Sequence, residues 1–222
     1  MTEKNPPGPD FWVHALARRI ALFENLRQGD FGEKLDRLSD LVARAMARDR
    51  KVLLFGNGGS AAAAQHVAAE WVGRFLTERN PLPAIALTTD SSILTAIGND
   101  YGFERIFERQ INALTQPGDV AIGISTTGGS ENVIRGLRAA GKRGAHTAAF
   151  LGGAGGRAKR AADTALIVSG AEVPLIQEAH GFLLHVLCEE VDRRLRAPRA
   201  GRKQGKTSPG GSAAGKKGSA RG

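Results

Sequence analysis

Five short apolar runs constrain this chain most strongly, because they alternate with segments long enough to form helices. The runs are Lys51–Gly56, Pro83–Thr88, Asp119–Ile124, His146–Leu151 and Thr164–Val168. None alternates apolar with polar residues as a half-exposed strand does, so each is expected to be buried on both faces. Amphipathic segments lie between them, at Ala61–Thr77, Phe103–Leu114, Asn132–Gly141 and Ala158–Asp163. This order predicts an α/β fold with a doubly wound, five-stranded parallel sheet flanked by helices.

The two ends of the chain add helices and a tail. Helical spacing predicts an N-terminal pair at Phe11–Arg27 and Phe31–Arg48, separated at Gly29-Asp30, and a last helix at about Leu175–Arg196. We therefore divide the chain into helices that pack on the core and at a subunit interface (1–49), an α/β domain (50–197) and a basic tail (198–222). The tail has no aromatic or aliphatic anchor and is expected to be disordered.

Net charge first suggests a nucleic-acid-binding protein. The chain has 31 basic and 22 acidic residues, a formal charge of +9, but seven of the basic residues and no acid lie in 198–222. Residues 1–197 therefore carry 24 basic and 22 acidic residues. Any contact with nucleic acid is expected to be non-specific and to be made by the tail. The alternative is that the tail is only a solubilising extension.

Membrane, secreted and disulfide-bonded classes are disfavoured. No apolar run approaches the roughly 18 residues that a spanning helix needs. The segment Met1–Asp10 is polar and lacks the apolar centre of a secretory signal. Cys188 is the single cysteine, so no intrachain disulfide can form. A reduced, cytoplasmic compartment is the expected location.

Two loops at predicted strand ends can bind a ligand. Gly56–Ala61 joins a strand to a helix, and its sequence suits either a phosphate or hydroxyl ligand or simply a tight turn. Ser125–Ser130 offers four hydroxyls and two glycines before a helix that starts near Glu131. This second loop favours a phosphate monoester, with a well-capped turn as the alternative. Thr88–Ser92 is a third polar strand end.

A possible metal site involves two helices. His66 and Glu70 are four residues apart, which places them on one helix face, although a structural His–Glu pair is the commoner interpretation. Gln177 and His185 interrupt an apolar helix pattern eight residues apart, roughly 12 Å along a regular helix. Either Gln177 precedes the regular helix, or one of these two side chains reaches the site from another subunit. We adopt the second hypothesis, under which Glu70→Ala and His185→Ala subunits should complement each other.

Taken together, these motifs resemble the phosphoheptose isomerase family, the sugar-isomerase-domain (SIS) enzymes of bacterial heptose synthesis. The residues that carry the resemblance are Gly56–Ala61, the His66/Glu70 pair, Leu94–Asp100, Ser125–Ser130 and Ile176–Glu178 with His185. They occur in the family's order and spacing across about residues 11–195. The loop Leu151–Arg157 and the basic tail depart from the family pattern, so the far end of the substrate or the subunit contact can differ here.

The resemblance implies a homotetrameric isomerase with one zinc ion per subunit. Its reaction would interconvert sedoheptulose 7-phosphate and D-glycero-D-manno-heptose 7-phosphate through an enediol, with Glu70 as base and His185 as acid. The implied zinc ligands are His66, Glu70, Gln177 and His185. The implied substrate contacts are Asn57, Gly58, Gly59, Glu70, Asn99, Asp100, Ser125, Thr126, Thr127, Ser130 and Gln177.

Two alternatives stay open at this point. One is a non-catalytic SIS relative, the DnaA initiator-associating protein, whose pattern lacks the acid at Glu70 and the histidine at His185. The other is an isomerase of a shorter phosphosugar, such as a pentose 5-phosphate, because a phosphate loop does not measure sugar length.

Overall fold

A computed structural model of the chain describes residues 8–196. Its centre is one sheet of five strands, all parallel, in the order β2-β1-β3-β4-β5. The strands are β1 (Val52–Gly56), β2 (Ala84–Ala86), β3 (Val120–Ser125), β4 (His146–Gly152) and β5 (Thr164–Val168). The predicted α/β fold with a five-stranded parallel sheet is therefore confirmed, and each apolar run supplies one strand.

Seven α-helices and two short 3₁₀ turns surround the sheet within residues 8–196. They are α1 (Pro9–Gln28), α2 (Phe31–Met46), α3 (Gly59–Val72), α4 (Ser91–Tyr101), η1 (Phe103–Arg105), α5 (Ile106–Leu114), α6 (Glu131–Lys142), η2 (Ala158–Ala161) and α7 (Val173–Arg196). The N-terminal helical pair and the break at Gly29-Asp30 are confirmed.

Two helix predictions were wrong in extent. The helix expected over Ala61–Thr77 ends at Val72, because Gly73 is its C-cap and the chain then turns back across the end of the helix. The segment expected to be a helix over Ala158–Asp163 forms only the single 3₁₀ turn η2. Asp163 accepts hydrogen bonds from the backbone N–H and the hydroxyl of Thr147, both at 2.9 Å, which fixes the chain in position to enter β5.

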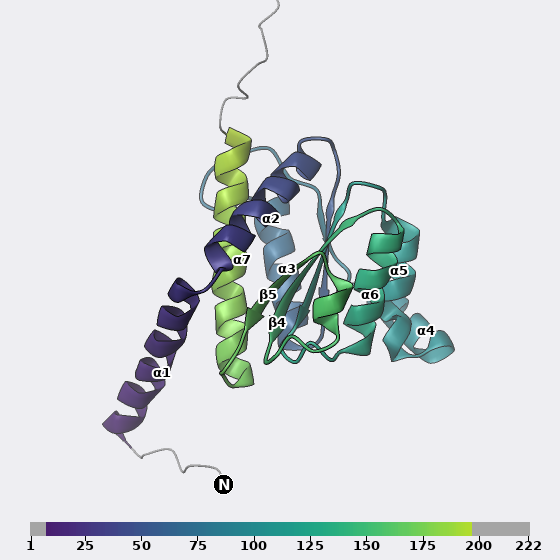
Figure 1. The fold of residues 1–222 in the computed structure, drawn as a ribbon. Helices are drawn as coiled ribbons and strands as arrows, with labels where there is room; N and C mark the ends of the chain where they lie inside the picture. Colours follow the sequence, from purple (N-terminus) through teal and green to yellow (C-terminus); the bar gives the residue numbers. More distant parts are fainter. Residues whose placement is uncertain (1–7, 197–222) are drawn as a thin grey trace, which may run out of the picture.

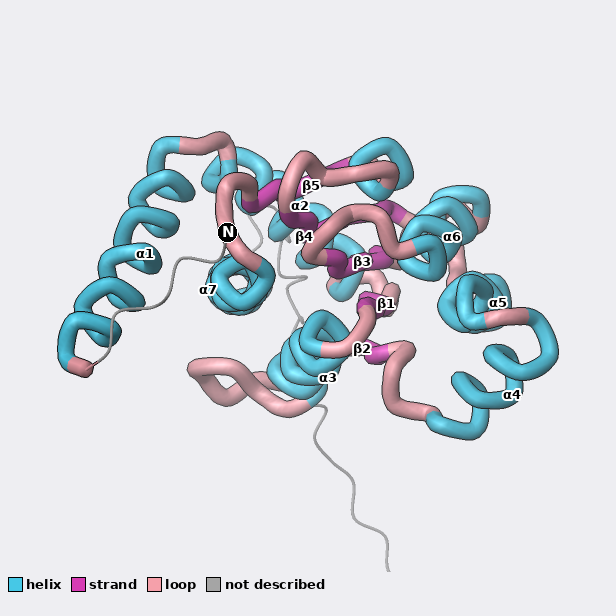
Figure 2. The backbone as a smooth tube through the Cα atoms, turned by 90° about the horizontal axis from the view of Figure 1, so that it is seen from below, coloured by secondary structure: helices cyan, strands magenta, loops and turns pink. Residues whose placement is uncertain are grey.

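The molecule has three layers, with helices on both faces of the sheet (Figure 1). On one face α2, α3 and α7 cover Val52, Leu54, Ile122 and Phe150, and on the other α5 and α6 cover Leu53 and Phe55 with their neighbours. Successive residues of one strand thus enter different cores, which explains why the runs show no polar alternation. The view along the layers in Figure 2 shows α7 and α4 at opposite sides of the molecule.

Helix α1 extends away from this body and contacts α7 and α2 (Figure 1). Arg18 and Arg19 pair with Glu172 and Glu178 at 3.1 and 2.6 Å, and Phe23 packs edge-on against Phe182. Much of its apolar surface stays uncovered, since Trp12, Val13 and Ile20 are more than three-fifths exposed.

None of the helices within 8–196 has the length and apolarity to cross a membrane. The predicted tail 198–222 lies outside the described residues.

Candidate active site

The loop after β1 is held to the first turn of α6 by a pair of asparagines. The Nδ2 of Asn57 donates to Oδ1 of Asn132 at 2.9 Å, and the Nδ2 of Asn132 donates back to Oδ1 of Asn57 at 2.8 Å. Gly58 has φ +53°, a conformation that favours glycine. The buried Asn132 was not predicted as a site residue. Its place in the first turn of the helix after the hydroxyl loop was the available signal.

Residues Ser125–Ser130 form a compact loop at the amino end of α6. Ser125, the last residue of β3, has its Oγ 3.1 Å from Oγ of Ser130 and accepts the N–H of Gly128 at 3.1 Å. The Thr127 hydroxyl accepts the N–H of Gly129. Ser130 is the N-cap residue of α6, but its hydroxyl makes no capping bond. The loop therefore combines hydroxyls with the amides of a helix amino end, an arrangement suited to a phosphate.

The glycine-rich segment after β4 supports this loop. A Cβ on Gly128 would lie 2.1 Å from the carbonyl oxygen of Gly155, and the N–H of Ala158 donates to the carbonyl of Gly128. Arg157 pairs with Glu131, the first residue of α6, at 2.9 Å. A hydrogen bond from Arg135, with Arg157 nearby, lowers the pKa of Glu131. Two arginines thus offset a carboxylate that would otherwise repel a bound phosphate.

Three predicted metal ligands converge between α3 and α7. Nε2 of His66 lies 2.8 Å from Nε2 of His185 and 3.5 Å from Oε1 of Glu70. One ligand atom from each residue lies within 4.8 Å of the other two. The ring of Phe75 packs 5.5 Å from that of His185. Two imidazole nitrogens and one carboxylate oxygen that lie this close together form a donor set that suits zinc.

The buried thiol and the buried imidazole of α7 do not join this cluster. Burial raises the pKa of the Cys188 thiol to about 12, so it is not a thiolate ligand near neutral pH. Burial also lowers the pKa of His180 to about 4. Its Nε2 lies 3.1 Å from the carbonyl oxygen of Leu151, to which the neutral ring donates, so His180 ties α7 to β4.

Gln177, the fourth predicted ligand, lies beside Gly59 at the start of α3. It is inside α7, so the suggestion that it precedes the regular helix was wrong. Its side chain packs against Gly59 instead, where an added Cβ would lie 2.4 Å from Nε2 of Gln177. Glu70 and His185 belong to one cluster within one chain, so the structure does not place these two ligands on different subunits.

Asn99 and Asp100 are also remote from the cluster. They lie exposed near the end of α4, and the Asn99 amide donates to Asp100 at 2.8 Å. Helix α4 is on the opposite side of the molecule from α7 (Figure 2). The third polar strand end is structural in this chain, because Asp90 caps α4 by accepting the N–H of Ile93 and Gln65 donates to Thr88.

A buried ion pair fixes the end of α3, and sequence reasoning missed it. Nε of Arg79 lies 2.8 Å from Oδ1 of Asp192 on α7, with the two side chains 10% and 3% exposed. The same guanidinium donates to the carbonyls of Glu70 and Trp71, each at 2.8 Å. Arg79 therefore caps the helix that carries Glu70 and ties it to the helix that carries His185. The feature of the sequence that could have predicted this ion pair is the acidic residue Asp192 on an otherwise apolar helix face.

Comparison with known proteins agrees with this architecture. A family model described as the SIS domain matches residues 17–152. The chain is 60% identical to phosphoheptose isomerase from Aquifex aeolicus over 162 residues, which cover 73% of this chain and 85% of that protein.

Solved structures give the same relationship. The structure of phosphoheptose isomerase from Francisella tularensis superposes with a TM-score of 0.79 at 32% identity, covering 83% of this chain and 97% of that one. That from Neisseria gonorrhoeae gives 0.76 at 40% identity, covering 82% and 96%. These matches favour the enzyme over a non-catalytic SIS protein. The chain belongs to the phosphoheptose isomerase family of SIS-domain proteins and is an isomerase.

Proposed function

We propose that this enzyme interconverts sedoheptulose 7-phosphate and D-glycero-D-manno-heptose 7-phosphate. The observation that carries the proposal is the convergence of Glu70, His66 and His185 between α3 and α7, in a chain that also has a hydroxyl-rich loop at a helix amino end. Moving a carbonyl between C1 and C2 needs a base, an acid and a counter-charge for the developing oxyanion. The cluster supplies groups for each of these tasks.

The phosphate of the substrate is assigned to the loop after β3. Ser125, Thr126, Thr127 and Ser130 supply hydroxyls, and the free amides at the start of α6 supply N–H donors. The hydroxyl of Ser130 supports this role, because it does not cap its own helix and is within hydrogen-bond distance of the Ser125 hydroxyl in the same loop. Asn57, Gly58 and Gly59 are assigned to the sugar hydroxyls, with the Asn57 amide oriented by Asn132.

Glu70 is the proposed base and His185 the proposed acid. Glu70 would take the proton from the carbon next to the carbonyl, and His185 would give a proton to the carbonyl oxygen, which leaves an enediol. The reverse transfers complete the isomerisation at the neighbouring carbon. Both side chains are partly covered, Glu70 being 22% exposed, and partial exclusion of water strengthens their interactions with a bound sugar.

A zinc ion fits the donor set. His66, Glu70 and His185 of one chain would hold it, with Gln177 of a partner subunit as the proposed fourth ligand. When bound, zinc would polarise the substrate carbonyl as a Lewis acid. Glu70 would hold the metal less tightly than the two imidazoles if it also serves as the base, and its 3.5 Å separation from His66 leaves the carboxylate without a short hydrogen bond to that imidazole.

A homotetramer is the proposed assembly, with active sites completed between subunits. Asn99 and Asp100 lie near the end of α4, on the opposite side of the molecule from α7, so a partner would supply them if they contact the same substrate. The exposed apolar residues of α1, including Trp12, Val13 and Ile20, support an interface there. The division into helices 1–49, domain 50–197 and tail 198–222 and the cytoplasmic location stay predictions.

A paired substitution tests the proposed reaction. Glu70→Gln should lower kcat for sedoheptulose 7-phosphate by roughly 10²–10⁴-fold without unfolding the protein. Glu78→Gln makes the same chemical change at an exposed carboxylate that pairs with Arg74 at 3.8 Å, and it should leave kcat unchanged. Substantial turnover by Glu70→Gln would refute the assignment. Faster conversion of a pentose 5-phosphate by the wild-type enzyme would instead favour the shorter substrate.

A further inference from the structure

A basic cavity lies at the amino ends of the strands, whereas the loops of the candidate active site lie at their carboxyl ends. It has a volume of about 280 Å³, and its lining includes Leu41, Arg44, Arg48, Arg50, Gly118 and His146. Its walls come from the end of α2, from the segments that lead into β1 and β3, and from the first residue of β4. The lining thus contains three arginines and a histidine but no acidic residue.

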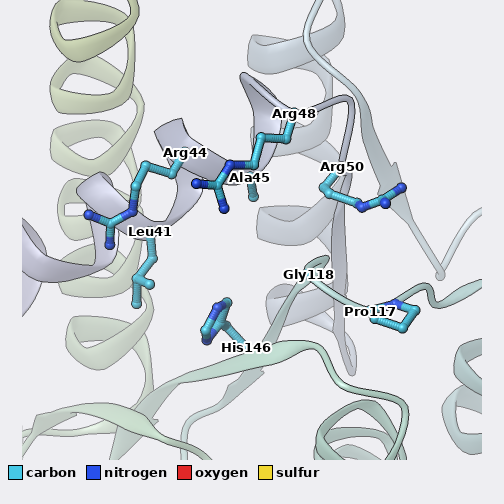
Figure 3. A pocket seen from close by; sticks show the side chains of 8 residues that line it. All are labelled: Leu41, Arg44, Ala45, Arg48, Arg50, Pro117, Gly118 and His146. Carbon is cyan, nitrogen blue, oxygen red and sulfur yellow. The ribbon is translucent and has the colours of Figure 1, made fainter.

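Two of these cations are oriented toward one space. Figure 3 shows the guanidinium groups of Arg44 and Arg48 on the side of α2 that faces the ring of His146, with Leu41 beside them, whereas Arg50 extends in the other direction. Arg50 donates to the side chain of Gln116 at 3.2 Å. The convergent donors are therefore Arg44, Arg48 and His146.

Three acids lie next to these residues: Asp40, Asp49, which lies between Arg48 and Arg50 in the sequence, and Asp119, which precedes β3. Asp40 pairs with Arg44 one turn away on α2. The buried Asp119 is occupied by the Lys51 ammonium at 2.7 Å and by two backbone N–H groups. Within residues 8–196 the Arg48 side chain makes neither an ion pair nor a hydrogen bond. Its guanidinium keeps all five N–H donors for a ligand.

Capping of α2 does not account for these arginines. Cationic side chains often lie at a helix carboxyl end because the last carbonyls lack partners. Here the N–H groups of Ala47, Arg48 and Asp49 donate to carbonyls of the last turn, and that of Arg50 donates back to Ala45. No side-chain hydrogen bond runs from Arg44 or Arg48 to a described carbonyl. Capping of α2 therefore leaves the guanidinium groups of Arg44 and Arg48 without a bond to the helix end.

We propose that this cavity binds the phosphate groups of a small anionic metabolite, separately from the substrate. Paired guanidinium groups suit phosphate because each can donate two parallel hydrogen bonds, and the imidazole of His146 adds a third donor. A volume of about 280 Å³ fits a diphosphate or a phosphosugar and is at the small end of the range for ligand pockets.

This site and the phosphate loop after β3 are at opposite ends of the same strands. The cavity precedes Val52 and Val120, whereas the loops that begin at Asn57 and Thr126 follow β1 and β3. Strands of this length separate the two edges by roughly 15–20 Å. One ligand of the proposed size cannot contact both, so occupancy of the two sites can be measured separately.

Calorimetric titration of the full chain with inorganic pyrophosphate, at fixed ionic strength and without divalent metal, tests the proposal. The wild-type protein should bind at two classes of site. Arg48→Gln should raise the Kd for pyrophosphate at the class of site assigned to the basic cavity about tenfold or more, while leaving kcat unchanged. Arg48→Lys, which keeps the charge but loses the planar fork, should give an intermediate loss. Ser130→Ala should weaken pyrophosphate binding only at the other class of site, which is the phosphate loop after β3.

Arg138→Gln is the matched control, because Arg138 is an exposed arginine on α6 away from the cavity. An equal loss in Arg138→Gln and Arg48→Gln would overturn the proposal in favour of a general charge effect. Unchanged pyrophosphate binding in Arg48→Gln would also overturn it. If Arg48→Gln instead weakened only a single-stranded oligonucleotide, the cavity would be part of a nucleic-acid surface and the proposal would be wrong.

Discussion

The Nε2 atoms of His66 and His185 lie 2.8 Å apart, although 119 positions separate the two residues in the sequence. Two imidazole nitrogens at this distance cannot both carry a proton, so they either share one hydrogen bond or face a common cation. Glu70, one turn after His66, adds an anionic oxygen to the same space. Packing of α3 against α7 therefore brings together the three side chains of the candidate active site.

Complementation between inactive subunits distinguishes which ligands share a chain. Mixing Gln177→Ala with Glu70→Ala subunits should restore roughly a quarter of the sites, because an intact triad of one chain can meet the Gln177 of another. Mixing Glu70→Ala with His185→Ala should restore none, since both substitutions damage the same triad. The measurement is isomerase activity after the subunits are dissociated and reassembled together. Recovery in the second mixture alone would contradict this arrangement.

Arg79 should act as a positioning residue for Glu70. Arg79→Ala leaves Asp192 buried without its partner and should lower the free energy of unfolding by about 3–5 kcal/mol. The double variant Arg79→Met/Asp192→Leu should recover most of that stability. It should still have reduced kcat, because the carbonyls of Glu70 and Trp71 lose their donor.

Urea unfolding and steady-state kinetics on the same samples separate these two effects. Arg74→Ala, in an exposed pair at 3.8 Å, is the control and should change stability by less than about 1 kcal/mol. Full recovery of kcat in the double variant would show that Arg79 has only a structural role.

His180 should make the protein less stable in mild acid. Its pKa is lowered from 6.5 to about 4 in the folded state because the ring is buried. The unfolded chain therefore binds a proton first as the pH falls, and stability is lost between about pH 6.5 and pH 4, by roughly 3 kcal/mol. Below that range this contribution no longer changes.

Unfolding at pH 7 and at pH 4.5 measures this contribution. His180→Gln, which retains an N–H donor for the carbonyl of Leu151, should be less stable than the wild type at pH 7 but should lose less stability on acidification. His14→Gln, at an exposed position on α1, should follow the wild-type pH dependence. An unchanged pH dependence in His180→Gln would contradict a neutral, buried imidazole.

Removal of 198–222 tests the division of charge along the chain. The truncated protein should keep its kcat and KM, because no proposed catalytic or substrate contact lies in the tail. It should lose most of any salt-sensitive binding to DNA, since the tail carries seven basic residues and no acid. Activity and DNA binding are measured on the same preparations. A fall in kcat would mean that the tail contributes to the active site.

The sequence by itself determined the layered fold and the local parts of the site. Apolar runs such as Lys51–Gly56 predicted strands because burial on both faces leaves no room for polar alternation. The spacing of His66 and Glu70 placed them on one helix face, since four residues make about one turn. The Ser125–Ser130 loop was recognisable because hydroxyls and glycines before a helix start are a local pattern. All of these are relations between residues close together in the chain.

Only the tertiary structure decided which distant residues meet. His185 reaches His66, Arg79 reaches Asp192, and Asn57 pairs with Asn132 because of how α3, α6 and α7 pack on the sheet. The same packing places Gln177 against Gly59 rather than beside His185. Helical periodicity fixes neighbours within a helix, but contacts between helices depend on their packing and offset, which side chains along the whole interface determine together.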